Sequence, residues 1–560
     1  MTDRRDFLAA CSTLGVGGSL FPGVLWAKVA AGAEITDETI VAAAEVAGVT
    51  FSPEDRALML DAVKGQTRSL DQLHAIPLEN AVAPAMIFTP LPRAGAVPTG
   101  PQHPVRMSRR PATARPARLE DLAFAELTTL ADLVRRRVVT SVDLTTMYLA
   151  RLERLDPKLL CTTTVLRERA LAQARAADAE IAAGRWRGPL HGIPWGAKDL
   201  LAVRGAPTTW GSAPFRDQRF DEDATVVQRL DAAGAVLIAK LTLGELAQGD
   251  RWYGGMTRNP WKLDQGSSGS SAGPGSATAA GCVGFAIGSE TLGSISSPST
   301  RNGVTGLRPT FGRVPRTGAM ALSWSMDKLG PMCRSVEDCA LVFSALHGPD
   351  GRDQTVHAAP FNWDGDAPLR GLKVGYVKSA FDAPLERHPT KPFDDAALGV
   401  LRGLGLELIP VELPDFNYNA MRIILTAEAG AAFDAFTRSG RVREMAQQGA
   451  GAWPNQFRTS RFIPAVDYVN ANRVRTLAIE AWDVLMRQLD VIVTPTAGTQ
   501  LTATNLTGHP AVILPNGFRD DGTPVSLTFL GRLFGEESLL RVAHHYQRAT
   551  PHHHAHPELG

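Results

Sequence analysis

The first part of the chain alternates apolar and polar positions at helical spacing. Apolar residues recur every three or four positions in the segments IVAAAEVAGV and PEDRALMLDAVKG. Such a period places the apolar side chains on one face of a helix. From Asp121 the same period returns. There it predicts a helix, a break near Thr140 and Ser141, and a second helix with Ser141 as its N-cap.

The rest of the chain mixes short apolar runs with helical periods. The runs AVLIAK, LKVGYV, LELIPVEL, LDVIVTP and PAVILP have the length of single strands. Between them lie helical patterns in ERALAQARAADAEIAAG, DATVVQRLDAAG and ESLLRVAHHYQRA, and a further one from about Phe393 to Leu404. Strands mixed with helices are typical of helical layers packed around a sheet, so the sequence predicts an α/β protein.

Proline content divides the chain into regions. Residues from about 77 to 116 are rich in proline, which predicts an extended strap or linker. We therefore expect a helical extension with this linker at 34–118, one large domain at 119–550 and a tail at 551–560. We expect the tail to be solvated and not to hold a metal. Its histidines are His552, His553, His554 and His556.

The N-terminus, residues 1–33, has the features of an export leader. Two arginines are followed after one residue by Phe7 and Leu8, which resembles the twin-arginine export signal. A weakly apolar stretch follows, and residues 31–33 form a small-residue cleavage site. No other segment has about 18 uninterrupted apolar residues, so no membrane span is expected in the mature protein. We expect a periplasmic or secreted protein, exported by the twin-arginine route.

Charge and cysteine content narrow the function classes. The chain has 58 basic and 57 acidic residues, and this near-neutral balance gives no reason to expect a nucleic-acid partner. Five arginines between positions 106 and 118 are interleaved with proline, and we interpret them as part of a solvated linker. Buried free thiols are expected beyond the leader, and a bond between Cys333 and Cys339 stays open. These cysteines are Cys161, Cys282, Cys333 and Cys339.

Residues 266–293 are dense in glycine, serine and alanine. A solvated tether is not favoured, because the stretch AAGCVGFAIG contains small and apolar residues but no charge. A phosphate-binding loop is excluded, because no Gly-Lys-Ser/Thr follows the glycines. The segment instead predicts a buried helix that runs into a tightly packed turn.

This segment and its neighbours resemble the amidase-signature family. The stretches DQGSSGSSAGPGSATAAG and GSETLGSISSPSTRNGVTGLRPT are similar to the family's core, and GIPWGAKDL and KLTLGELAQG resemble its upstream motifs. LDVIVTPTA and NLTGHPAVILPNG resemble its C-terminal strands, so the resemblance runs from about Asp121 to Ala549. It implies an α/β/α layered fold around a mixed central sheet, similar to bacterial amidases and to the A subunit of glutamyl-tRNA amidotransferase.

The resemblance implies a Ser-Ser-Lys triad. Lys198 in GIPWGAKDL matches the family's base, and Ser294, at the end of the Gly-Ser turn, matches its nucleophile. Ser267, Ser268, Ser270 and Ser271 all compete for the bridging role, in which the family holds a serine by a cis peptide bond. Ser270 matches best, because it lies 24 positions before Ser294 and nine after Trp261, as in the family. Ser267 ranks second.

This triad also makes chemical sense. A serine hydroxyl attacks a carbonyl only when a neighbouring base takes its proton. Lysine, with an ordinary pKa of about 10.4, can be that base only if burial lowers its pKa toward neutrality. The apolar residues around Lys198 favour such burial, and Asp199 is expected to point away from it. The backbone N–H groups of Thr291, Leu292 and Gly293 are candidates for the oxyanion hole.

Four positions depart from the family's usual pattern. The family's usual Asp before the turn is Glu290, its first turn glycine is Leu292, and the arginine two after the nucleophile is Ser296. Pro274 stands where the family often has serine. None of these changes removes a catalytic atom, but each affects the shape of the oxyanion loop or of the acyl pocket.

The sequence therefore predicts an amide hydrolase that acts on a small-molecule amide through a serine acyl-enzyme, without cofactor or metal. It is compatible with a homodimer. Two alternatives stay open: an amidotransferase A-subunit-like protein, and a catalytically inactive binding protein on the same scaffold. Five apolar side chains near the motifs are candidates for the substrate pocket or for the core. They are Trp195, Trp210, Trp252, Met320 and Trp324.

Overall fold

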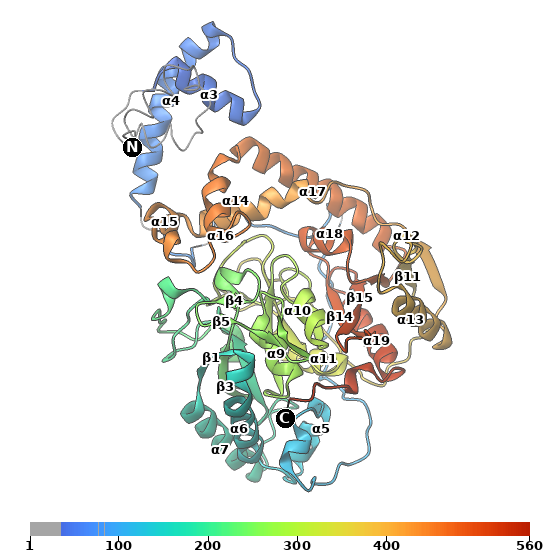
Figure 1. The fold of residues 1–560 in the computed structure, drawn as a ribbon. Coiled ribbons are helices and arrows are strands. Elements are labelled where there is room, and N and C mark those ends of the chain that lie inside the picture. The colour runs from blue at the N-terminus through green and yellow to red at the C-terminus, as the bar shows by residue number, and fades with distance from the viewer. Residues whose placement is uncertain (1–34, 77, 83, 94, 560) are drawn as a thin grey trace.

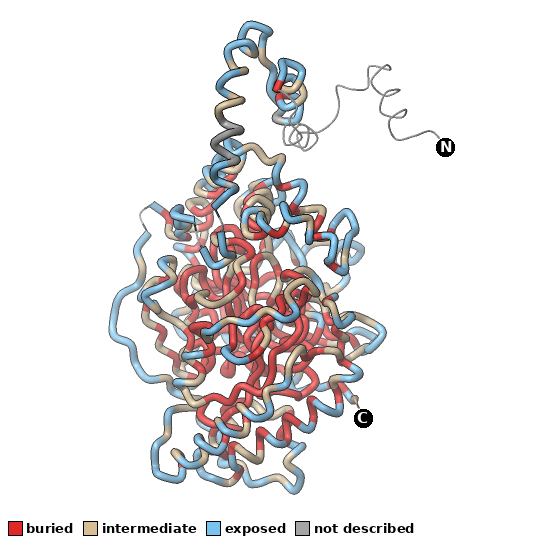
Figure 2. The backbone as a smooth tube through the Cα atoms, turned by 90° about the vertical axis from the view of Figure 1, so that its left-hand side faces the viewer, coloured by how far each residue is buried: buried red, intermediate tan, exposed pale blue. Residues whose placement is uncertain are grey.

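The computed structural model describes residues 35–76, 78–82, 84–93 and 95–559. The predicted leader at residues 1–33 lies outside these residues. Within them, the chain folds around one large sheet, and the buried residues gather in its centre (Figures 1 and 2).

Eleven strands form a mixed sheet, as predicted. Strand β2 runs parallel to β3 and β8, and β11 runs parallel to β12 and β13. The remaining neighbours are antiparallel. Strands β2, β3 and β10 are buried at every position, and β3 coincides with the predicted apolar run AVLIAK, as expected of a fully buried strand. In spatial order the strands are β1 (Thr162–Val165), β3 (Val236–Leu241), β2 (Pro194–Lys198), β8 (Phe285–Glu290), β10 (Lys328–Cys333), β9 (Thr305–Arg308), β14 (Ala511–Phe518), β15 (Pro524–Gly531), β13 (Val491–Pro495), β11 (Val374–Val377) and β12 (Leu408–Val411).

Helices cover both faces of the sheet. Helices α9 (Ala272–Ala279) and α10 (Ser296–Asn302) pack on each other and on its middle strands. Helices α11 (Val336–Leu346) and α19 (Glu536–Arg548) form a second pair on the same part of the sheet. The other helices of the large domain are α5 (Leu127–Arg135), α6 (Ser141–Leu159), α7 (Arg167–Ala182), α8 (Thr225–Ala232), α12 (Lys378–Phe381), α13 (Lys391–Gly403), α14 (Ile423–Ala432), α15 (Asp434–Arg438), α16 (Trp453–Thr459), α17 (Ala465–Met486) and α18 (Thr499–Thr507).

Two short hairpins lie outside the large sheet. One pairs β4 (Arg251–Trp252) with β5 (Gly255–Met256), and the other pairs β6 (Arg258–Asn259) with β7 (Lys262–Gly266). The second hairpin leads directly into the serine-rich loop before α9, and so it helps to fix the start of that loop.

Two local predictions need correction. The cap of α6 is Thr140, whose hydroxyl accepts a hydrogen bond from the Asp143 backbone N–H at 2.9 Å. The Ser141 hydroxyl instead donates to the Gly192 carbonyl. The stretch AAGCVGFAIG is not mainly helical. Helix α9 ends at Ala279, and Phe285–Glu290 forms β8, because this apolar segment pairs with both β2 and β10 in the buried middle of the sheet.

The N-terminal extension contains the two predicted helices, α3 (Asp37–Ala47) and α4 (Pro53–His74), which project from the large domain (Figure 1). The proline-rich segment after them has no helix in its described residues, as expected of an extended segment. The five arginines between positions 106 and 118 each form an ion pair with a carboxylate, and all but Arg110 keep half or more of the side chain exposed, in line with the predicted solvated linker. The pairs are Arg106–Asp364, Arg109–Asp366, Arg110–Glu126, Arg115–Asp143 and Arg118–Asp121.

Two further features bear on the predictions. Cys161, Cys282, Cys333 and Cys339 are buried free thiols, as expected, and no bond joins Cys333 to Cys339. In the part of the chain that the structure describes, we find no helix with the length and apolar character needed to cross a bilayer.

Candidate active site

Lys198 is the last residue of β2, a strand enclosed between β3 and β8. Its side chain is fully buried, and its Nζ atom lies 2.8 Å from Ser270 Oγ. Burial lowers the pKa of Lys198 well below its ordinary value of 10.5, and the more distant carboxylates of Asp327 and Glu290 only partly oppose this. The strand therefore places an amine next to a serine hydroxyl, and the lowered pKa of this amine favours its neutral form.

Two further serines complete the surroundings of this amine: Ser271, one of the serines considered for the bridging role, and Ser289, to which the sequence assigned no role. Lys198 Nζ lies 3.0 Å from Ser271 Oγ and 2.9 Å from Ser289 Oγ. The Ser271 hydroxyl in turn donates to the Ser289 carbonyl and accepts from its N–H. These hydroxyls supply hydrogen bonds that orient the amine, and they place no charge beside it.

Asp199, the next residue along, points away from the amine, as predicted. Its carboxylate pairs with Lys240 at 2.6 Å and accepts hydrogen bonds from the N–H and hydroxyl of Thr209. Successive side chains of a strand face opposite sides, so Lys198 and Asp199 take part in separate networks. The carboxylate nearest in sequence therefore does not stabilise a charged Lys198.

Ser270 is the candidate bridging serine that lies beside Lys198. The peptide bond between Gly269 and Ser270 is cis, and the Ser270 side chain is buried. Ser267, the second choice, is also buried, but its hydroxyl donates to the Ser268 carbonyl. The structure thus brings Ser270, and not Ser267, to the lysine.

Ser294 lies in the turn between β8 and α10 and is partly exposed. The Ser271 N–H donates to the Ser294 carbonyl at 3.1 Å, which joins this turn to the loop that carries Ser270. Among the described residues, no hydrogen bond joins the two hydroxyls of Ser270 and Ser294. The sequence-predicted residues therefore share one region, with the lysine and Ser270 in direct contact and Ser294 on the adjoining turn.

The turn itself offers hydrogen-bond donors. Gly293 has a φ of 98°, a left-handed conformation that favours glycine. Within the described residues, the backbone N–H groups of Leu292, Gly293 and Ser294 have no acceptor in the protein. Free N–H groups on one tight turn can stabilise a negatively charged oxygen. The Thr291 N–H likewise has no acceptor among the described residues, while its hydroxyl donates to Asp327 at 2.5 Å.

Glu290 holds this turn in shape. One carboxylate oxygen accepts hydrogen bonds from the N–H groups of Ile295 and Ser296, and the other binds Arg308 and Asn505. Burial alone raises the pKa of Glu290, but the Arg308 guanidinium and these donors bring it down to about 2. Glu290, one carbon longer than the family's usual Asp, is therefore ionised and holds the turn through these hydrogen bonds.

A cavity of about 590 Å³ opens beside these residues. Its catalytic end is formed by Leu200, Ser289 and Thr291, and its apolar walls include two of the predicted pocket residues, Met320 and Trp324. The other three tryptophans belong to the core: Trp195 stacks on Phe285, Trp210 packs against Phe215 and Phe433, and Trp252 packs against Tyr253.

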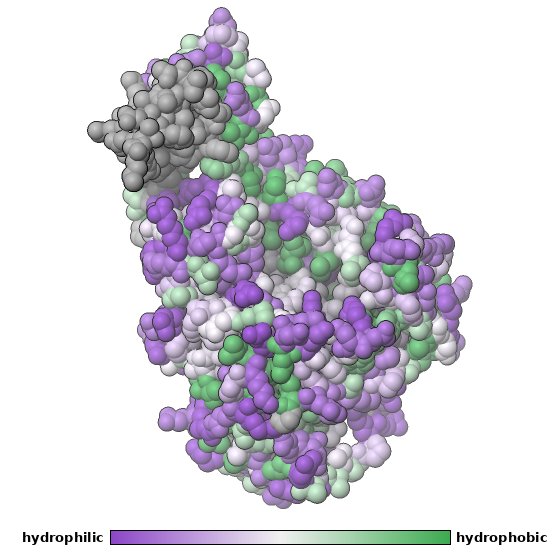
Figure 3. Space-filling model, viewed as in Figure 1, coloured by the Kyte–Doolittle hydropathy of each residue, from purple (hydrophilic) through white to green (hydrophobic). Residues whose placement is uncertain are grey.

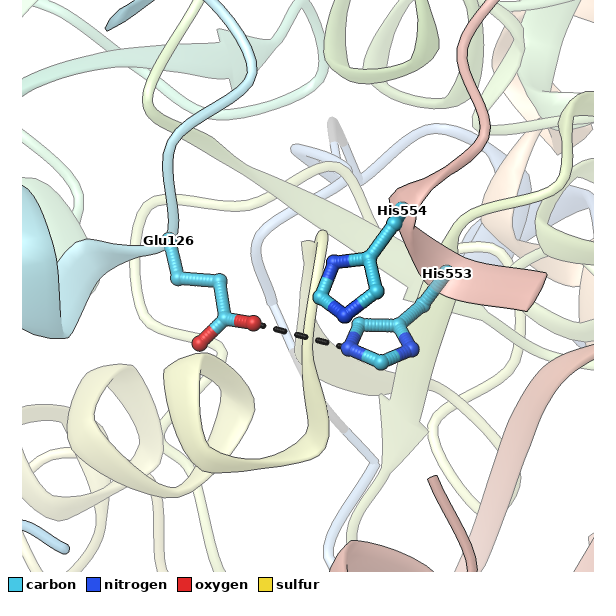
Figure 4. Close-up of side chains that lie close together, drawn as sticks. All are labelled: Glu126, His553 and His554. Carbon is cyan, nitrogen blue, oxygen red and sulfur yellow. Dashed lines mark ion pairs between the residues drawn. The ribbon is translucent and has the colours of Figure 1, made fainter. Parts of the chain in front are cut away.

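The C-terminal tail contacts the domain through several side chains, which corrects part of the expectation of a solvated tail, although His554 and His556 are exposed. His556 stacks on Phe124 with ring centroids 4.0 Å apart, and Lys158 donates to the Leu559 carbonyl. His553 Nε2 faces the Glu126 carboxylate at 3.5 Å, with the His554 ring beside it (Figure 4). The apolar face of Phe124 and the buried Glu126 carboxylate provide the contacts that hold the tail.

Glu126, His553 and His554 are the described residues whose geometry could hold a metal ion, since their ligand atoms lie within 4.8 Å of one another. The same carboxylate is also paired with Arg110, whose positive charge opposes a bound cation. The cluster is remote in sequence from the lysine and the serines, and none of the contacts of Lys198 involves it.

Comparison with known proteins gives a consistent result. The model of the family described as Amidase matches residues 143–503. The A subunit of glutamyl-tRNA(Gln) amidotransferase from Geobacter metallireducens is 35% identical over 484 residues, which are 78% of this chain and 98% of that protein. A putative amidase, AmiD, of Mycobacterium bovis is 35% identical over 479 residues, covering 80% and 99%. The solved peptide amidase of Stenotrophomonas maltophilia is similar at a TM-score of 0.69, with 31% identity over 77% of this chain and 97% of that one.

Proposed function

The chain belongs to the amidase family and is an amide-hydrolysing enzyme, and we propose that Ser294, Ser270 and Lys198 carry out the hydrolysis. The single observation that carries this assignment is the contact between Lys198 Nζ and Ser270 Oγ at 2.8 Å inside a fully buried site. A buried amine with a lowered pKa is a general base that can act near neutral pH.

The proposed reaction passes through an acyl-enzyme. Ser294 Oγ attacks the amide carbonyl carbon while its proton moves to Ser270, whose own proton moves to Lys198 Nζ. The protonated lysine then returns a proton through Ser270 to the leaving nitrogen, and the C–N bond breaks. Water attacks the acyl group by the same route in reverse, which releases the acid and restores Ser294.

Negative charge on the carbonyl oxygen is proposed to be stabilised by the turn that carries the nucleophile. Thr291, Leu292 and Gly293 are the candidates from sequence, and support comes from their N–H groups and that of Ser294, which have no acceptor among the described residues. Each such donor typically contributes about 3 kcal/mol of transition-state stabilisation. Glu290 supports this arrangement because it fixes the N–H groups on the other side of Ser294.

We propose a small-molecule substrate: an aryl or acyl amide, or the C-terminal amide of a peptide. The similar structure from Stenotrophomonas maltophilia carries the name peptide amidase, and the cavity beside the turn has the size of a pocket for a compact ligand. The assignment is tested by assaying the leaderless protein against a panel of amides and esters. Hydrolysis that disappears in Ser294→Ala supports it, and unchanged hydrolysis in that variant contradicts it.

A second candidate is an amidotransferase A-subunit-like role, favoured by the 35% identity to the Geobacter metallireducens protein. The predicted export leader argues against this role, because the role requires partner subunits that lie in the cytoplasm. Glutaminase activity that depends on added amidotransferase subunits would support this alternative. A catalytically inactive binding role is disfavoured by the presence of all three candidate catalytic residues.

We also propose that the protein is exported by the twin-arginine route to the periplasm or beyond. The support is the sequence of the N-terminus, with Arg4 and Arg5 ahead of Phe7 and Leu8. The test is cell fractionation of the parent and of the double variant Arg4→Lys, Arg5→Lys. Export of the parent and cytoplasmic retention of the variant are expected, and equal export of both would contradict the proposal.

A further inference from the structure

A segment of the N-terminal extension passes over the cavity beside the catalytic turn. We call residues 84–92 the strap. Five strap residues, Pro84, Ala85, Met86, Ile87 and Phe88, line the cavity together with Ala81. The strap lies outside residues 143–503, the part that matches the family model, so it is an addition to the matched region.

The strap is fixed to the large domain ahead of the cavity. Just before it, the Asn80 side chain donates to the carbonyls of Ala321 and Ala432 and accepts from the Ala321 N–H. Three hydrogen bonds from one amide side chain use both its donor and its acceptor groups. Ala321 itself lines the cavity, so this anchor ties the start of the strap to the opposite wall.

A second set of contacts fixes the strap beyond the cavity. The Phe88 ring lies between Arg475, whose guanidinium carbon is 3.4 Å from the ring centroid, and Phe311. Pro90 is buried against Gly508, where even a single added carbon would lie 2.7 Å from the proline ring. The strap is therefore a built element and not a loose linker, because contacts hold it on both sides of the cavity.

Between these anchors the strap exposes apolar side chains. Met86 is 69% exposed and Ile87 is 50% exposed, although both line the cavity. Figure 3 shows apolar surface and a hollow in the domain just below the projecting N-terminal helices. Exposed apolar side chains that face a cavity lose contact with water only when an apolar group enters it, which is favourable.

The wall of the cavity opposite the strap is also apolar. Met320, Leu322, Trp324 and Leu329 supply apolar surface there. The charged residues that line the cavity have partners: Arg316 pairs with Asp353, Arg352 pairs with Glu222, and Asp327 accepts hydrogen bonds from Thr291, Leu322 and Ser323. No described charge on this wall is left to bind an ionic group, so the cavity suits an uncharged one.

The cavity adjoins the proposed catalytic centre. Ser289 and Thr291 form part of its wall, and Ser289 Oγ lies 2.9 Å from Lys198 Nζ. We propose that the strap completes a pocket for a bulky, apolar and uncharged substituent of the substrate amide, with Met86 and Ile87 as the residues that select it. This inference rests on the proposed function, since it assigns the substrate class of the same site.

The test uses the leaderless full-length protein and two matched double variants. Met86→Ala, Ile87→Ala removes the two exposed cavity side chains. Leu78→Ala, Val82→Ala removes two apolar side chains of the same extension, 66% and 54% exposed, that do not line the cavity. Two substrate series are compared, one of primary amides from acetyl to decanoyl and phenylbutanoyl, and one of acetyl amides whose amine grows from methyl to benzyl and naphthyl.

We expect the parent to prefer the larger apolar members of one series. In Met86→Ala, Ile87→Ala, the ratio of kcat/KM between the largest and the smallest member is expected to fall about tenfold, because apolar contact area is lost. In Leu78→Ala, Val82→Ala the ratio is expected to stay at the parent value. The series that responds identifies the side of the amide that enters the pocket. Equal ratios in all three proteins would overturn the inference.

A binding measurement separates this inference from the proposed catalytic role. Isothermal titration of Ser294→Ala with the same amides should give tighter binding of the larger apolar members, and addition of Met86→Ala, Ile87→Ala should raise their Kd about tenfold. If the parent hydrolyses no amide but this pattern of Kd appears, the proposed function is contradicted and the apolar binding pocket is supported. If hydrolysis depends on Ser294 but neither Kd nor kcat/KM responds to the strap, the pocket fails and the function stands.

Discussion

Lys198 Nζ and Ser270 Oγ lie 2.8 Å apart in a site where both side chains are buried. The contact joins the end of a central strand to a serine-rich loop 72 residues later in the chain. Because burial lowers the pKa of Lys198, the hydrogen bond brings a hydroxyl to an amine that can accept its proton.

The pH dependence of activity follows from this pKa. Lys198 acts as a base only in its neutral form, so kcat/KM is expected to rise with pH through a pKa that lies well below 10.5. Lys198→Met should retain the fold and lose at least about 10²-fold in kcat/KM. The measurement is a pH–rate profile of the parent with circular dichroism of both proteins. A profile that rises only near pH 10.5 would contradict a buried neutral base.

The same lysine predicts a dependence of stability on pH. The unfolded chain protonates Lys198 below about pH 10.4, whereas the folded chain favours the neutral amine, so the unfolded state binds more protons. The lysine therefore lowers the free energy of unfolding near pH 7, and this penalty shrinks as pH rises toward 10.5. Thermal unfolding of parent and Lys198→Met at pH 7 and pH 9.5 checks this. The parent should gain stability relative to the variant at the higher pH; a constant difference would refute it.

Two serines of one loop provide a matched pair of variants. Ser270→Ala removes the hydroxyl that contacts Lys198 and is expected to lower kcat/KM by about 10²–10⁴-fold. Ser267→Ala removes a buried hydroxyl that binds only the Ser268 carbonyl, and kcat/KM should stay within a few-fold of the parent. Steady-state kinetics on one amide decides between them. Equal losses would mean that the loop acts through its shape and not through a proton relay.

Glu290 should be required both for stability and for the shape of the nucleophile turn. Glu290→Gln leaves Arg308 without its buried partner and is expected to lower the free energy of unfolding by about 3–5 kcal/mol. Because the pKa of Glu290 is lowered to about 2, its contribution is present above about pH 4.5 and is lost as pH falls toward 2. The measurement is denaturant unfolding at pH 7 and pH 3.

The control for Glu290 is Asp382→Asn, which removes an exposed ion pair with Lys378. Its unfolding midpoint is expected to stay at the parent value, since exposed pairs contribute little. Glu290→Asp, which introduces the family's usual residue, should keep the charge and part of the activity. A Glu290→Gln variant as stable as the parent at pH 7 would show that the ion pair between Glu290 and Arg308 is not needed for stability.

The C-terminal tail is expected to contribute to stability. Ending the chain at Thr550 uncovers the Phe124 ring and removes the histidine that faces Glu126, so the free energy of unfolding should fall by about 1–2 kcal/mol. Thermal unfolding of the truncated and parent proteins measures this. Glu558→Ala, which alters an exposed tail residue, serves as the control. A truncated protein with an unchanged midpoint would mean that the tail contacts are not maintained in solution.

Much of the site could be predicted from local sequence. The apolar residues around Lys198 indicated a buried strand, and the resemblance to the amidase-signature family, through its spacing from Trp261 and Ser294, selected Ser270 over Ser267. The roles of Ser271 and Ser289 could not be found in this way, because their contacts with Lys198 depend on how β2, β8 and the α9 loop meet in the sheet.

The sequence was less informative where a contact joins distant segments. A position at the end of a chain favours exposure to solvent, so the contacts of the tail could not be predicted; Phe124, more than 400 residues earlier, provides its binding surface. The strap shows the same limit. Its proline content indicated an extended segment, whereas its place over the cavity depends on Asn80, Phe88 and Pro90 finding partners in the large domain.

The most direct test of the central claim is covalent labelling with a fluorophosphonate probe followed by peptide mapping. We predict a single adduct on Ser294 Oγ, no labelling of Ser294→Ala, and labelling of Lys198→Met and Ser270→Ala that is slower by about 10²-fold or more. An adduct on another serine, or labelling of Lys198→Met at the parent rate, would contradict a serine nucleophile activated by a buried lysine.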